Sequence, residues 1–132
     1  MFKRIDHVEI VVKELEEPLE FYTDVLGFQV AERRELAEPP ADAPIQEIVY
    51  LTLGDTALEL ILVKNAPGPA PGEWRAGYRM MALEVEDLDA TVQHCEENGV
   101  EVTWGPVEMQ RYRRAEIEDP AGFPLELREW TG

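Results

Sequence analysis

The 132-residue chain has few basic residues and a single cysteine. Its 12 lysines and arginines stand against 28 aspartates and glutamates, which gives a formal net charge of −16. Nucleic acids and anionic membranes recruit proteins that carry a basic face, so this acidity argues against both partners. Because Cys95 is alone, it cannot form a disulfide within the chain.

Long apolar runs are also missing. No stretch approaches the roughly 18 apolar residues of a membrane span, and the N-terminal sequence MFKRIDHVEIVV turns polar before a signal-type apolar region develops. We therefore expect a soluble, cytoplasmic protein. The 45% of hydrophobic residues can still form a core, either in one compact unit or in two small halves that share it.

Proline is concentrated in two places. Six of the ten prolines lie in the segments AEPPADAP and NAPGPAPG. Proline fixes φ and removes a backbone donor, so both segments are predicted to be loops.

The same order of elements is predicted on each side of the second loop. Before it, a strand over Ile5–Val12 places His7 and Glu9 on one face, and an amphipathic helix over 18–28 ends near Gly27. Two further strands follow, at Glu47–Leu53 and Ala57–Val63, joined by a hairpin turn.

After the loop, a strand over Met80–Val85 leads to a helix that Asp87 can cap and Gly99 can end. The remaining predicted strands are Val100–Trp104, Arg113–Glu118 and Leu125–Leu127. The two halves end alike, with T-A-L-E-L in the first and F-P-L-E-L in the second. An internal duplication accounts for this repetition.

Three motifs in this duplicated frame carry a resemblance. His7 lies in I-D-H-V, Glu59 in G-D-T-A-L-E-L and Glu126 in D-P-A-G-F-P-L-E-L. Over Ile5–Trp130 the chain resembles the vicinal oxygen chelate superfamily, which includes glyoxalase I, methylmalonyl-CoA epimerase, extradiol dioxygenases and bleomycin-resistance proteins.

The resemblance implies an α+β fold in which two paired βαβββ modules form a curved mixed sheet around a cleft. It implies a single domain over 1–132, with module one at about 4–64, a linker at about 65–77 and module two at about 78–130. It also implies a homodimer.

A divalent metal (Ni, Zn, Fe or Mn) is the cofactor that the resemblance implies, with His7, Glu59 and Glu126 as its ligands. The fourth ligand position of the superfamily falls on Met80. A thioether is a soft and weak ligand for these metals, so the metal is expected to bind weakly or to be absent. Met80 is interpreted instead as an apolar lining residue.

The implied function is that of a glyoxalase-I-like lyase or isomerase. It would act on a small substrate with vicinal oxygens by abstracting a proton next to a carbonyl, with Glu126 or Glu59 as the base. Extradiol dioxygenases use two histidines and one carboxylate, the opposite ratio to this chain, so a dioxygenase is less favoured.

Two other functions stay open. One is a metal-free protein that sequesters a small molecule, as bleomycin-resistance proteins do; the missing ligand, the three tryptophans and the acidic surface favour it. The other is a structural or regulatory homodimer without a ligand.

Further substrate contacts are predicted at two residues besides Met80. Trp74 lies in the second loop segment, and Arg113 leads into the strand before the last turn. Strand alternation puts Arg111 and Arg113 on one face and Arg114 on the other, so at least one arginine can reach an anionic group or, equally, pair at the surface. His94 is interpreted as solvated and Cys95 as part of the core.

Overall fold

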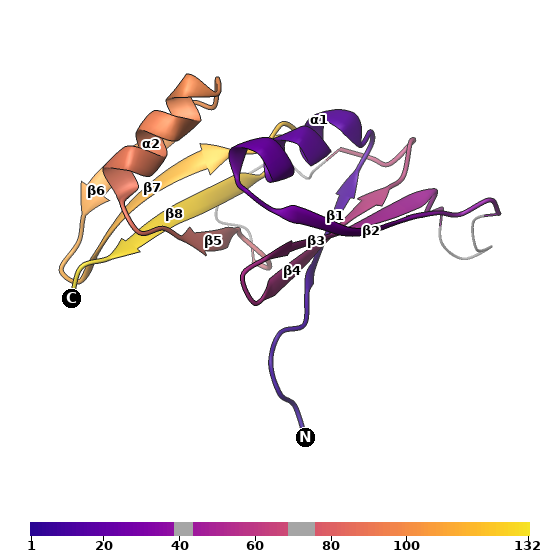
Figure 1. The fold of residues 1–132 in the computed structure, drawn as a ribbon, viewed down its shortest axis with the longest axis horizontal. Coiled ribbons are helices and arrows are strands. Elements are labelled where there is room, and N and C mark those ends of the chain that lie inside the picture. The colour runs from indigo at the N-terminus through magenta and orange to yellow at the C-terminus, as the bar shows by residue number, and fades with distance from the viewer. Residues whose placement is uncertain (39–43, 69–75) are drawn as a thin grey trace. The chain divides into compact units, whose positions relative to one another are not determined.

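A computed structural model of the chain describes residues 1–38, 44–68 and 76–132. The chain divides into two compact units, Met1–Pro69 and Ala70–Gly132. Each unit contains one four-stranded mixed sheet and its own helix (Figure 1). Trp74 lies outside the described residues.

Unit one has the order strand, helix and three strands. Its elements are β1 (Val8–Val12), α1 (Glu16–Glu20), the π-helical turn η1 (Phe21–Val25), β2 (Gln29–Glu35), β3 (Glu47–Leu53) and β4 (Thr56–Leu62). The strands lie in the order β1-β4-β3-β2, with β1 parallel to β4 and the other neighbours antiparallel. The first and last strands of the unit are therefore adjacent.

Two elements of unit one differ in extent from the sequence prediction. Strand β1 begins at Val8 instead of Ile5, whose side chain is exposed. The predicted helix is divided into α1 and η1, and the Thr23 hydroxyl donates to the Leu19 carbonyl (2.7 Å) within the wider turn. Gly27 follows with φ of 88°, a conformation in which glycine avoids the strain of a side chain.

Unit two repeats this order. Its elements are β5 (Met81–Glu84), α2 (Leu88–Glu97), β6 (Val102–Glu108), β7 (Tyr112–Glu118) and β8 (Pro124–Trp130). The strand order is β5-β8-β7-β6, and β5 is parallel to β8. Helix α2 lies along one side of the sheet (Figure 1), and the Asp87 carboxylate caps it by accepting from the Ala90 N–H (3.0 Å).

The cores of the two units are built from equivalent cross-strand pairs. In unit one, Val49 pairs with Leu60 and Leu51 with Leu58; in unit two, Ala115 pairs with Leu127 and Ile117 with Leu125. All eight side chains are buried. Because successive side chains of a strand alternate between faces, residues between these leucines point to the opposite face of each sheet.

The α+β fold of two βαβββ modules that the sequence predicts is confirmed. Strand β2, which is exposed along its whole length, was not among the predicted strands. In the described part of the chain, no helix combines the length and the apolar character needed to cross a membrane.

Candidate functional site

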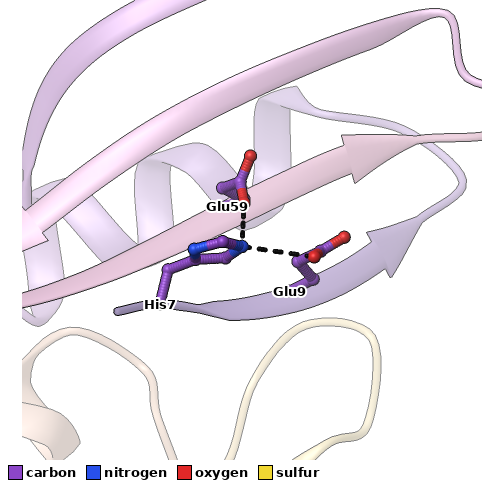
Figure 2. Close-up of side chains that lie close together, drawn as sticks. All are labelled: His7, Glu9 and Glu59. Carbon is purple, nitrogen blue, oxygen red and sulfur yellow. Dashed lines mark hydrogen bonds and ion pairs between the residues drawn. The ribbon is translucent and has the colours of Figure 1, made fainter. Parts of the chain in front are cut away.

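His7 lies immediately before β1 and is surrounded by carboxylates (Figure 2). Its Nδ1 is 2.9 Å from Asp6 Oδ2, while its Nε2 is 3.2 Å from Glu9 Oε2 and 2.5 Å from Glu59 Oε2. The imidazole side chain is 34% exposed, and that of Glu59 only 10%. Solvent can therefore reach the imidazole of His7, whereas the carboxylate of Glu59 is largely shielded from it.

The sheet register brings these residues together. Glu9 and Glu59 are partners in the parallel pairing of β1 with β4, and His7 lies two residues before Glu9. Two residues along a strand return to the same face, so His7 and Glu9 point the same way. Glu59 lies between the buried Leu58 and Leu60 and is therefore directed to the other side of the sheet from the core.

The carboxylates favour the charged form of the imidazole. The pKa of His7 is raised above its usual 6.5, first by the hydrogen bond to Asp6, next by that to Glu9, and also by the charge of Glu59. The hydrogen bond with His7 in turn lowers the pKa of Asp6. In the absence of a metal ion, a protonated His7 can donate from both ring nitrogens to these acceptors.

The donor set of unit one fits a divalent metal ion. His7, Glu9 and Glu59 each offer a ligand atom, and the three atoms lie within 4.8 Å of one another. One imidazole nitrogen and two carboxylate oxygens suit Zn, Ni, Fe or Mn. A divalent cation would balance the two negative charges that the glutamates bring when His7 is neutral.

The register also defines the equivalent positions of unit two. Ala82 pairs with Glu126 between β5 and β8, as Glu9 pairs with Glu59 in unit one. Met80, two residues before Ala82, is therefore the equivalent of His7. Unit two retains the glutamate and has a half-buried methionine and an alanine in place of the other two donors.

Glu126 is held by arginines. Its Oε1 is 2.9 Å from Nη2 of Arg114, and its Oε2 accepts from Nε of Arg128 (2.6 Å). Arg114 also donates to Glu116 (2.5 Å), which pairs with Glu126 across β7 and β8. We call Arg114, Glu116, Glu126 and Arg128 the arginine–glutamate network.

Aromatic rings flank the network. The Arg114 guanidinium lies 4.7 Å from the centre of the Trp104 ring, and that of Arg128 lies 3.9 Å from Tyr112. Both contacts are within the range of cation–π attraction. Nε of Arg114 is buried and makes no hydrogen bond within the described part of the chain.

Arg113 points to the other face of the sheet. It pairs with Glu129 across β7 and β8, one position removed from the network, and its guanidinium binds Asp89 of α2 through two hydrogen bonds of 2.9 and 3.1 Å. The arginines on the Glu126 face are thus Arg114 and Arg128. Cys95 is buried, as predicted.

Of the predicted metal ligands, the structure brings together His7 and Glu59 in unit one, and Glu126 belongs to unit two. Glu9 was not among the sequence-predicted ligands, although its place on the His7 face was visible from strand alternation. Arg128 was missed too, although it lies two residues from Glu126 and so shares its face.

Comparison with known proteins identifies the family. The model of the Glyoxalase/Bleomycin resistance protein/Dioxygenase superfamily matches residues 4–127. The chain belongs to this superfamily, so the resemblance drawn from the sequence motifs is confirmed.

Individual relatives include named enzymes. The methylmalonyl-CoA epimerase of Mus musculus is 32% identical over 93 residues, which cover 67% of this chain and 49% of the epimerase. The chain thus spans about half the length of that relative. The lactoylglutathione lyase of Haemophilus influenzae is 30% identical over 128 residues, 96% of this chain and 92% of the lyase.

A solved structure agrees with the fold. A glyoxalase family protein from Bacillus cereus superposes with a TM-score of 0.83 at 24% identity, covering 100% of this chain and 97% of that one. At this level of identity, the similarity shows the fold.

Proposed function

We propose that the protein is a metal-dependent lyase or isomerase that abstracts a proton next to a carbonyl in a small substrate with neighbouring oxygens. The observation that carries the proposal is the cluster of His7, Glu9 and Glu59, a metal-type donor set at the N-terminal end of β1. Relatives named lactoylglutathione lyase and methylmalonyl-CoA epimerase support the reaction class.

His7 and Glu59 would hold the metal, together with Glu9. When bound, the metal would supply positive charge that stabilises an oxyanion formed beside the carbon that loses its proton.

Glu59 is the proposed base. Its Oε2 faces His7, so Oε1 is the atom to which we assign the substrate proton. Its low exposure keeps bulk water from competing for that proton. Without the metal, the Nε2 of the imidazole holds the orientation of this carboxylate. Glu126 is left out of this assignment because two arginines hold its carboxylate.

The test is proton exchange in D2O with lactoylglutathione and methylmalonyl-CoA as separate probes. Deuterium incorporation next to the carbonyl is expected for the metal-loaded wild type. His7→Ala and Glu59→Gln should reduce its rate by about 100-fold or more, because general-base catalysis alone contributes that much. The matched control is His94→Ala, which removes the other histidine, an exposed residue of helix α2.

An unchanged rate of deuterium exchange in both variants would exclude this cluster as the catalytic site. The absence of exchange with either probe would count against the proposed reaction.

The second candidate function is metal-free sequestration of a small molecule. Met80 and the arginine–glutamate network favour it, since unit two lacks a metal-type donor set at the equivalent positions. Titration with bleomycin distinguishes the two functions. A sequestration protein should bind it equally well with or without a chelator and in His7→Ala.

We further propose that the protein acts as a homodimer on a small molecule in the cytoplasm. Within each chain we propose one domain, with modules at about 4–64 and 78–130 and a linker at about 65–77, in which Met80 and Trp74 contact the substrate. Arg113, the third contact predicted from the sequence, is left out of this proposal because its guanidinium binds Asp89 on the helix side of the sheet. Sedimentation of the purified chain tests the dimer. A single monomeric species at micromolar concentration would contradict it.

A further inference from the structure

Glu126 and Glu59 occupy equivalent positions in the two sheets but have different partners. An oxygen of Glu59 meets the His7 imidazole, whereas each oxygen of Glu126 meets an arginine. A carboxylate between two guanidinium groups is already neutralised. A divalent cation bound at Glu126 would lie next to the two positively charged guanidinium groups. Water would screen this repulsion poorly, since only 8% of the Glu126 side chain is exposed.

Unit one provides an internal comparison for the arginines. The cross-strand pair Arg114 and Arg128 is equivalent by register to Ile48 and Ile61. At these two positions Glu59 of unit one has aliphatic neighbours, whereas Glu126 of unit two has arginines. The arginines are therefore a feature of unit two and not of the βαβββ module as such.

The residues at the other two donor positions also make unit two a poorer metal site than unit one. Unit one has an imidazole and a carboxylate at His7 and Glu9, where unit two has Met80 and Ala82. Losing two donors and gaining two cations both lower the affinity of a site for metal.

We infer that Glu126 is a member of the arginine–glutamate network and not a metal ligand, and that the metal takes its protein ligands from His7, Glu9 and Glu59. The metal part of this inference rests on the proposed function. The assignment of Glu126 to the network rests on the contacts of unit two.

Zinc titration of the metal-free full chain tests the ligand set. Glu9→Gln and Glu59→Gln should weaken zinc binding by about tenfold or more, because each removes a charged donor. Glu126→Gln should leave the affinity within about twofold of the wild type, as should the matched control Glu116→Gln in the same network.

Thermal unfolding of the same metal-free proteins tests the network. Glu126→Gln should lower the Tm because two guanidinium groups lose their shared acceptor. In an Arg128→Ile background, the same change should lower the Tm by less, because one of those contacts is already gone. Circular dichroism of each variant establishes that it is folded.

The outcomes separate the inference from the proposed function. A tenfold loss of zinc affinity in Glu126→Gln overturns the inference and leaves the metal-dependent function standing. A wild type that binds no zinc or other divalent metal overturns the proposed function and the metal part of the inference. Additive changes in Tm for Glu126→Gln and Arg128→Ile overturn the network.

Discussion

Asp89 and Arg113 connect helix α2 to strand β7 through a two-point ion pair. The Arg113 hydrogen bond lowers the pKa of Asp89 below its usual 3.8. A group whose pKa falls on folding stabilises the fold above its unfolded pKa, and this stabilisation disappears as the pH drops through the folded pKa. The ion pair should therefore contribute at neutral pH and vanish in acid.

We predict that Asp89→Asn lowers the Tm at neutral pH and that its difference from the wild type closes as the pH falls below 3.8. Thermal unfolding followed over this range measures the difference. Asp55→Asn, in the exposed turn between β3 and β4, is the control. A difference that persists in acid would show that the Asp89 carboxylate stabilises the fold without its charge.

At the residue scale, the sequence indicated candidate side chains and the face of the strand on which they lie, but not the residues that contact them. It identified His7, Glu59 and Glu126 from motif and order, and it placed Glu9 on the His7 face. The sequence could not predict the ion pair between Glu126 and Arg114, because that contact depends on the pairing of β7 with β8. Strand alternation fixes the face of a residue, whereas only the register fixes its neighbours.

Among the elements, α2 is the one whose beginning is most clearly specified by a side chain. Asp87 accepts from the Ala90 N–H, which would otherwise have no partner in the first helical turn. We predict that Asp87→Ala reduces the free energy of unfolding by about 1 kcal/mol. Urea unfolding measures the loss, and Glu86→Ala, at the preceding exposed residue, should change stability by less than about 0.5 kcal/mol. Equal effects in the two variants would show that the cap is not stabilising.

Strands were predictable where they carry a largely apolar run. Strand β3 alternates buried with half-buried side chains over most of its length and β4 is mostly buried, and the expected segments agree with both strands within one residue. Strand β2 has charged residues along much of its length and none buried, so nothing in its sequence distinguishes it from a loop. Its place at the edge of the sheet, hydrogen-bonded to β3 alone among the strands, explains why it needs no apolar face.

For the whole molecule, the dominant electrostatic property is the charge of −16. Mutual repulsion of this size opposes the compact state, and salt weakens it by shortening the Debye length to about 8 Å at 0.15 M. We predict that the Tm of the metal-free protein rises with ionic strength, equally for NaCl and KCl. Differential scanning calorimetry measures the shift. A Tm that falls with salt would mean that ion pairs such as those of the network outweigh the general repulsion.

The sequence also predicted the duplicated architecture, because the order of elements and the L-E-L endings survive in both halves. The divergence of the halves was visible only in part. From the sequence, Met80 indicated that the two halves differ at a ligand position. That Arg114 and Arg128 replace Ile48 and Ile61 is known only from the strand pairing in both sheets.

The pairing of β7 with β8 places glutamate opposite glutamate and arginine opposite arginine. The ion pairs of the network therefore form between residues of the same strand, and between Arg114 and Glu126 on the diagonal. Neutralising one glutamate removes part of the compensation for the Arg114–Arg128 pair, and neutralising one arginine does the same for the Glu116–Glu126 pair. We therefore expect the network to tolerate one neutralising substitution less well than the replacement of all four charges by apolar side chains of similar volume.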